Sequence, residues 1–336
     1  MKKNPFVIFI LSICVICLLL GIANVAPKNI NKKADANSAK IDKIIAQANN
    51  KIAVIPIAGV ISSEPSNNIF EEDSPSVMAL NAIVRATDDD SIKGVILEIN
   101  SPGGTVGMSQ KIYNAVLQLR KKKPVIALLD DIAASGGYYI ASAADRIVCL
   151  PGTMTGSIGV IMSTMDIHRL LNEKLAINEN VIKSGRYKDI GSSTRAMTKE
   201  ERDMLQDMVN DSYEQFVEAI KVGRVERNDN YGVKIEPLNY DRLRSIADGR
   251  IFTGRQALEA GLVDSTGGID LAKEMMQLMV SKKFGLSSKV NLEYDDSYAK
   301  SAGILKLFGI KSHSNPIDAM LPQSMKYARK PLYLWE

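Results

Sequence analysis

The chain has few of the residues on which many catalytic and structural sites depend. Its 336 residues include only two histidines, three cysteines and one tryptophan. Three cysteines cannot build a disulfide framework, and Cys14, Cys17 and Cys149 all lie in apolar stretches, where a cysteine serves as a small hydrophobic residue. The shortage of histidine also leaves few candidates for the commonest kind of general base.

Net charge is also low. The 42 Lys and Arg residues nearly balance 38 Asp and Glu residues, which leaves +4 at pH 7. So small an excess argues against a nucleic-acid partner. The one dense basic run, Lys121 to Lys123, follows an apolar-periodic segment, where cations suit the end of a helix. The composition is otherwise that of a globular protein, long enough for one large domain or two modest ones.

One long segment near the N-terminus carries no charge. Phe6 to Val25 is apolar, and at about 1.5 Å per residue it matches the roughly 30 Å core of a bilayer. We interpret residues 6–26 as an uncleaved single-pass anchor in the cell membrane, preceded by a short tail, residues 1–5. A cleavable signal peptide is the alternative, but its apolar core is usually shorter. The short tail favours an N-inside orientation, with the bulk of the chain outside the cytoplasm.

After a polar linker, residues 27–50, strand and helix signals alternate. The predicted strands are Ile52–Ile61, Gly94–Ile99, Val125–Leu129, Arg146–Leu150 and the short Val181–Ile182, and the predicted helices are Met108–Arg120 and Gly136–Ala144. This order predicts an α/β domain, residues 51–284, with βαβ units and a mainly parallel sheet. Residues 285–336 lose the periodicity and are interpreted as a C-terminal tail.

A long amphipathic helix is predicted near residue 200. Thr198 and Glu201 have the spacing of a capping box. Apolar residues then recur on one face, which predicts that they belong to the core: Met204, Leu205, Met208, Val209, Phe216, Val217 and Ile220.

Two glycine-rich motifs lie where a predicted strand is followed by a helix. They are Ser101-Pro102-Gly103-Gly104 and Ala133-Ala134-Ser135-Gly136-Gly137. The carboxyl ends of parallel strands are where ligands bind in such sheets. Alone, the first motif is a tight turn and Ser135 a helix N-cap. Together they favour Ser135 as a nucleophile, with the N–H groups of Gly103 and Gly136 available to an oxyanion.

A serine nucleophile needs a base. His313 lies in the polar tail and His168 in a predicted ordinary helix, so neither is favoured. A lysine can serve only when it is neutral, which requires burial that lowers its pKa from about 10.4 by several units. Composition does not select one lysine; Lys188, in the loop that follows Val181–Ile182, is one of many.

Four motifs in this order resemble the signal peptide peptidase A family, also called protease IV: Ser101–Gly104, Ala134–Tyr139, Thr155–Gly159 and Ser184–Lys188. Residues 253–255 and 257–264 fit the family as well. The resemblance covers about residues 51 to 285, and the length is similar to that of the short, single-repeat form in Gram-positive bacteria. One mild departure is Arg186, which stands where a lysine is also common.

The resemblance implies a Clp protease/crotonase-like fold that follows one transmembrane helix. It assigns Ser135 as nucleophile, Lys188 as general base, Ser157 as the hydroxyl that orients the lysine, and Gly103 as oxyanion donor. The stretch that matches the catalytic histidine of the Clp subunit, residues 159–161, contains none. The implied activity is the hydrolysis of signal peptides left in the membrane after secretion, with no metal or cofactor. The implied assembly is a homo-oligomeric ring in which serine and lysine can come from neighbouring protomers.

Two other functions share this pattern. A crotonase-type enzyme acting on acyl-CoA would use the same oxyanion glycines, although an outward-facing membrane domain counts against it. A non-catalytic membrane scaffold could keep the same fold. The C-terminal end, Lys330 to Glu336, holds the only tryptophan and could dock in a substrate groove as an extended strand, but a surface-packed or disordered end is the simpler interpretation.

Overall fold

The computed structural model describes residues 50–64, 74–226, 231, 238–295 and 332–334. The predicted membrane anchor, most of the linker and most of the C-terminal tail lie outside these residues. Within the described part of the chain, no helix is both long enough and apolar enough to cross a membrane.

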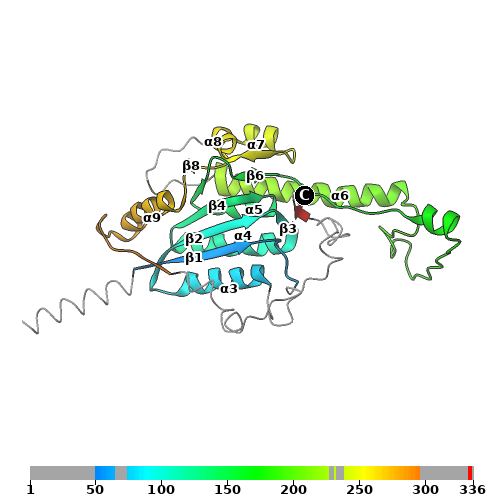
Figure 1. Cartoon of the computed structure of the whole chain (residues 1–336), viewed down its shortest axis with the longest axis horizontal. Coiled ribbons are helices and arrows are strands. Elements are labelled where there is room, and N and C mark those ends of the chain that lie inside the picture. Colours follow the sequence, from blue (N-terminus) through cyan, green and yellow to red (C-terminus); the bar gives the residue numbers. More distant parts are fainter. Residues whose placement is uncertain (1–49, 65–73, 227–230, 232–237, 296–331, 335–336) are drawn as a thin grey trace, which may run out of the picture. The chain divides into compact units, whose positions relative to one another are not determined.

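A mainly parallel sheet forms the centre of the fold (Figure 1). Its path runs β7-β6-β4-β2-β1-β9, and β5 and β8 join it beside β4. The strands are β1 (Lys51–Ala58), β2 (Ile92–Ser101), β4 (Val125–Ala134), β5 (Arg146–Cys149), β6 (Met154–Gly156), β7 (Ile251–Thr253), β8 (Ser265–Thr266) and β9 (Glu293–Asp295). Among these described strands only β6 and β7 pair antiparallel. The predicted α/β architecture is confirmed and is consistent with a Clp protease/crotonase-like fold, and the sheet extends past residue 285 to β9.

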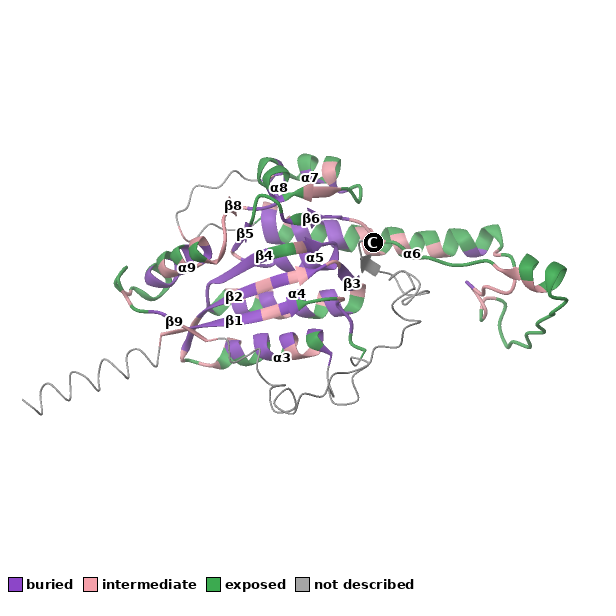
Figure 2. Cartoon of the chain, in the orientation of Figure 1, coloured by how far each residue is buried: buried purple, intermediate pink, exposed green. Residues whose placement is uncertain are grey.

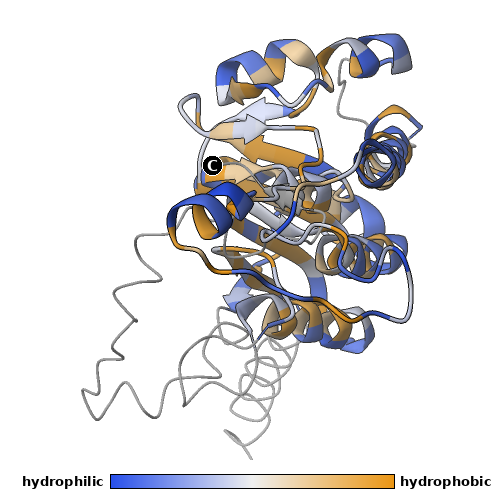
Figure 3. Ribbon diagram, turned by 90° about the vertical axis from the view of Figure 1, so that its right-hand side faces the viewer, coloured by the Kyte–Doolittle hydropathy of each residue, from blue (hydrophilic) through white to orange (hydrophobic). Residues whose placement is uncertain are grey.

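Helices cover both faces of this sheet. One face packs against α3 (Pro75–Asp88), α4 (Val106–Lys122) and α5 (Gly136–Ala141), and the other packs against α9 (Ile269–Phe284). Residues such as Leu97 point to the first face and Ile96 and Ile126 to the second. Strands buried on both faces are continuous apolar runs, which is why the sequence signal was strong. Figure 2 shows the buried strands, and Figure 3 shows hydrophobic ribbon on them and hydrophilic ribbon on outer helix surfaces.

The remaining elements are β3 (Gly103–Thr105), η1 (Leu170–Lys174), α6 (Lys199–Ile220), η2 (Lys221–Val225), α7 (Tyr240–Ile246), α8 (Gly254–Ala260) and β10 (Leu332–Leu334). The capping box of α6 is confirmed, because Thr198 and Glu201 each bond the other's backbone N–H.

Two sequence predictions were wrong. Val181 and Ile182 form no strand and are exposed.

The second error concerns α6. Its C-terminal end is buried, including Phe216, Val217 and Ile220, but Met204 and Met208 near its start are 41% and 50% exposed. Residues 161–198, which we call the arm, precede this exposed end, and Gly191 is their one buried residue within the described chain. In Figure 1 the arm lies at the end of α6 remote from the sheet. The apolar stripe therefore continues beyond the core of a single chain.

Candidate active site

Ser135 occupies a sharp turn between β4 and α5. The preceding residue, Ala134, pairs with Gly156 of β6, and the Ser135 N–H donates to the Gly156 carbonyl at 2.8 Å. Ser135 has φ 51° and ψ −114°, a conformation that residues with a side chain rarely adopt. Such strain persists only where the surrounding structure imposes it, and it concentrates at functional sites.

The hydroxyl of Ser135 is buried without a hydrogen bond. The residue is 1% exposed, and its Oγ has no partner among the described residues. It stands at the N-cap position of α5 but makes no side-chain cap bond. Buried polar atoms are nearly always paired, so an unpaired one calls for an explanation. The side chain of Ser135 therefore does not cap α5, and its Oγ is left unpaired in the described part of the chain.

Three of the other predicted residues lie around this turn. Ser157 directly follows β6, has φ 50°, and donates its N–H to the Arg250 carbonyl at 2.8 Å. Ser135 and Ser157 thus follow paired residues of neighbouring strands. Gly103 comes just after the end of β2, where Ser101 pairs with Ala133 of β4.

The two predicted oxyanion donors differ in their present bonding. Gly136 is the first residue of α5, where a backbone N–H has no acceptor inside the helix. The Gly103 N–H instead donates to Ser101 Oγ at 3.1 Å. Gly103 has φ 108°, a conformation suited to glycine. Its N–H must exchange the Ser101 hydroxyl for an oxyanion before it can stabilise one.

β3 lies between two other segments. On one side, Ile61 donates to the Gly103 carbonyl and accepts from the Thr105 N–H, both at 2.8 Å. On the other side β10 pairs antiparallel, with Leu334 opposite Gly103 and Leu332 opposite Thr105. Residues 332–334 are thus an extended strand beside β3, and the strand runs in the direction of Gly103.

Lys188 lies apart from these residues. It belongs to the arm, it is exposed, and its amine has no hydrogen-bond or ion-pair partner among the described residues. From Lys199 to Phe216, where α6 enters the core, the helix rises about 25 Å. Since Ser135 Oγ has no partner, a single copy of the chain brings together Ser135, Gly136, Gly103 and Ser157 but not Lys188.

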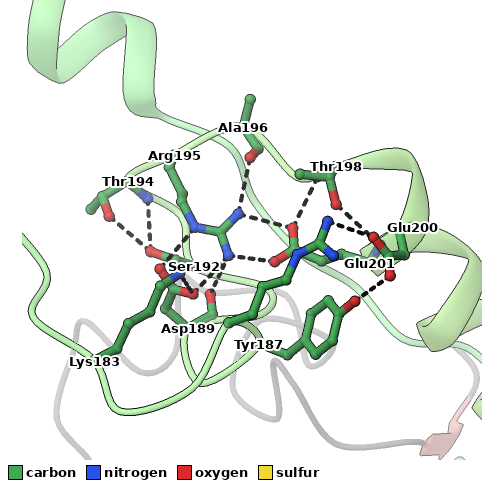
Figure 4. A network of polar contacts seen from close by, with 11 residues as sticks. Lys183, Tyr187, Asp189, Ser192, Thr194, Arg195, Ala196, Thr198, Glu200 and Glu201 are labelled. Atoms are coloured by element: carbon green, nitrogen blue, oxygen red, sulfur yellow. Dashed lines mark hydrogen bonds and ion pairs between the residues drawn. The ribbon is translucent and has the colours of Figure 1, made fainter.

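A network of charges surrounds Lys188 in the sequence (Figure 4). Arg195 and Lys183 both bind Asp189, and these bonds hold the pKa of the Asp189 carboxyl far below its usual range. Arg195 also binds Glu201, whose pKa is lowered to about 2 by Arg195 and by the Thr198 N–H. The sequence analysis did not find this network and identified Glu201 only as a helix cap. Alternating charges from residue 183 to 201 were the available signal.

His168 does not contact the Ser135 Oγ, which has no hydrogen-bond partner in the described chain. The His168 Nδ1 lies 2.5 Å from Asp166 Oδ1 in the arm, and His313 lies outside the described residues. In the described part of the chain, no group of three or more His, Cys, Asp or Glu residues is arranged to hold a metal ion. Cys149 is buried, and burial raises the pKa of its thiol to about 11.

A cavity of about 650 Å³ opens beside Ser157. It lies between the segment from Ser157 to Ile161 and the face of α6 that carries Val209 and Tyr213. Arg244 of α7 and the loop after α7, which includes Asp248, complete its lining. The cavity therefore connects the neighbourhood of the serine turn with the exposed part of α6.

Comparison with known proteins shows to which family the chain belongs. Residues 117–282 match the model of peptidase family S49. A putative protease from Synechocystis is 39% identical over 224 residues, which are 67% of this chain and 72% of that protein. The chain belongs to peptidase family S49. This S49 peptidase is accordingly a serine peptidase, a hydrolase, and the resemblance to the signal peptide peptidase A family is confirmed.

Other relatives agree with the assignment. A putative protease from Methanocaldococcus jannaschii is 42% identical, over 59% of this chain and 60% of that protein. A putative signal peptide peptidase SppA from Enterococcus faecium is 35% identical, over 66% of this chain and 61% of that protein. The chain thus spans about three-fifths of the length of these two relatives. A solved mutant of a membrane-bound stomatin-specific protease is 17% identical, with a TM-score of 0.43 over 74% of this chain and 98% of the other. Membership of a peptidase family decides against the acyl-CoA alternative.

Proposed function

We propose that this S49 peptidase is a membrane-anchored endopeptidase that hydrolyses signal peptides remaining in the membrane, by means of a Ser135–Lys188 dyad. The observation that carries the proposal is the buried, unpartnered Oγ of Ser135 at a strained turn between strand and helix. The apolar run from Phe6 to Val25 supports an anchor, which places the domain outside the cytoplasm. The name of the relative from Enterococcus faecium supports the substrate class.

In the proposed mechanism the neutral amine of Lys188 takes the proton of Ser135 as Oγ attacks a peptide carbonyl. The N–H groups of Gly103 and Gly136 stabilise the negative charge that forms on the carbonyl oxygen. The Lys188 ammonium then gives its proton to the departing amine, which leaves an acyl-enzyme. The same amine next activates a water molecule, which releases the acyl group. The hydroxyl of Ser157 orients the Lys188 amine toward Ser135.

The dyad requires a second copy of the chain. Lys188 is exposed in one copy, whereas a lysine that acts as base must be buried to lose its proton near neutral pH. The arm exposes many large apolar side chains, which is typical of an interface: Met165, Leu170, Leu175, Ile177, Val181 and Ile182. The cavity beside Ser157 leaves room for a partner's arm. Because arm and cavity are different surfaces, their contact repeats head to tail, and such a repeat forms a ring when the rotation from copy to copy closes.

The peptide is proposed to bind as an added strand on β3. The antiparallel pairing of β10 with β3 supports this mode, since the same backbone groups can pair with a substrate. A strand there runs toward Gly103 and the serine turn. Backbone pairing also suits a peptidase whose substrates differ in side chains.

Replacing either dyad residue tests the proposal. Ser135→Ala and Lys188→Ala should each abolish peptide hydrolysis and leave the circular dichroism spectrum unchanged. A fluorophosphonate should label the native protein at Ser135, which a non-catalytic scaffold would not allow. Substantial hydrolysis by the Lys188→Ala protein would remove lysine from the mechanism. Mixing the two inactive variants should restore part of the activity, and no recovery would mean that each dyad lies within one chain.

A further inference from the structure

Arg195 joins the residue after Lys188 to the start of α6 (Figure 4). Its Nε and Nη2 donate to the Asp189 carboxylate at 2.9 and 2.8 Å. Its Nη1 and Nη2 donate to the Glu201 carboxylate at 2.9 and 2.5 Å. The Asp189 and Glu201 side chains are only 12% and 4% exposed, so water does not replace these bonds. One guanidinium therefore binds both carboxylates, because the planar guanidinium of arginine can donate to two carboxylates at once.

The other charged groups near Lys188 are also paired. Lys183 binds Asp189 at 2.5 Å, and Glu200 accepts from Tyr187 and binds Arg186 at 2.6 Å. We refer to residues 183–198 of the arm as the Lys188 loop. The segments next to it carry the pairs Asp166–His168 and Lys199–Asp203, and the cation Arg202. Every carboxylate of the loop and of the first turn of α6 thus has a partner other than Lys188. Lys188 itself has no anionic partner among these described residues.

This arrangement matters because a lysine acts as a base only when it is neutral. A carboxylate within about 4–6 Å of an ammonium group stabilises the charged form and raises its pKa by about one to three units. Asp189 is the next residue in the chain and is the carboxylate most able to pair with Lys188. A released Asp189 would pair with the Lys188 ammonium and oppose the loss of its proton when a partner subunit buries it.

We propose that Arg195 is a positioning residue for the general base, because it holds the carboxylates of Asp189 and Glu201 away from the Lys188 amine. The inference rests on the proposed function, in which Lys188 is the base. Lys183 alone cannot replace Arg195, since it binds Asp189 and would leave Glu201 without a cationic partner. Arg195 also ties the arm to α6, so a test must separate this structural contribution from the effect on charge.

The test is the pH dependence of kcat/KM for peptide hydrolysis by the assembled full chain. In Arg195→Met the limb at which the base loses its proton should move to higher pH by about one unit, with about tenfold slower hydrolysis below it. Rates at high pH should approach those of the native enzyme. Adding Asp189→Asn and Glu201→Gln to Arg195→Met should move the limb back, since neither released carboxylate then carries a charge. Glu201→Gln keeps the capping box of α6. Arg202→Met, at an exposed arginine near the start of α6, should leave the limb unchanged.

Three results would overturn the inference. One is an unmoved limb in assembled Arg195→Met, and another is a shift that Asp189→Asn together with Glu201→Gln does not reverse. The third is failure of both variants to assemble, because Arg195 would then serve the fold of the arm alone. These results differ from failure of the dyad itself. If Lys188→Ala remains active the proposed base is wrong, whereas an inactive Lys188→Ala with an unmoved limb removes only the role of Arg195.

Discussion

At the scale of single residues, two serines share an unusual backbone conformation. Ser135 and Ser157 both have φ near 50°, and such conformations cost about 1–3 kcal/mol each. The pairing of β4 with β6 and the bonds from their N–H groups to Gly156 and Arg250 hold them in place. Both residues therefore lie at neighbouring strand ends, and the hydrogen bonds of the sheet offset the cost of their backbone conformations.

Gly104 is a residue beside the candidate site where one added methyl group should have a large effect. A Cβ at this position would lie 2.0 Å from the backbone oxygen of Ile61, which cannot move without breaking its bond to Thr105. We expect Gly104→Ala to displace β3, lower stability by about 1–3 kcal/mol in urea unfolding, and slow peptide hydrolysis at least tenfold.

Gly107 provides a matched control for this substitution. It lies in the first turn of α4, and a Cβ there would meet no atom within 4 Å. Gly107→Ala should therefore keep activity and raise stability by up to about 1 kcal/mol. If Gly104→Ala matched Gly107→Ala in stability and turnover, the close approach of β3 to Ile61 would not matter to the site.

At the scale of elements, β10 and a bound peptide would compete for the same backbone groups of β3. β10 already pairs with it, so a peptide can add a strand there only after β10 leaves. Deleting residues 332–336 should lower KM for a peptide several-fold, with little change in kcat. Steady-state kinetics on the full chain and on the deletion variant measure both constants.

The melting temperature provides the control for this deletion. It should change little, because β10 contributes only three residues to the fold. Unchanged KM and kcat would show that peptides bind elsewhere. A loss of kcat would instead mean that the tail supports the catalytic turn.

At the scale of the whole molecule, the exposed arm predicts how copies of the chain meet. Ile182 is fully exposed and lies in the same arm as Lys188. Since burying a charge without a partner is costly, Ile182→Glu should prevent assembly and abolish hydrolysis. The mass measured by light scattering should fall to that of one chain.

Leu278 of α9 serves as the control at this scale. It is 57% exposed but lies on a helix that covers the sheet, away from the arm. Leu278→Glu should leave both mass and activity unchanged. An assembled and active Ile182→Glu protein would show that the arm does not form the contact.

Much of this protein could be predicted from sequence because the patterns are local. Continuous apolar runs marked the parallel strands, and the glycine-rich motifs at their ends marked Ser135, Gly103 and Gly136. The relation of Ser135 to Ser157 followed from the resemblance, and the pairing of Ala134 with Gly156 gives it a physical basis. Spacing along the chain was enough here, because adjacent strand ends meet at one edge of the sheet.

Tertiary structure alone decided what covers each apolar face and which charges pair. Periodicity showed that α6 has an apolar stripe, but only packing showed that Phe216 is buried and Met208 is exposed. Likewise, composition could not distinguish Lys188 from other lysines, whereas the bonds of Arg195 show why its acidic neighbours do not bind it. Burial and ion pairing depend on contacts between segments far apart in sequence, and no local pattern contains that information.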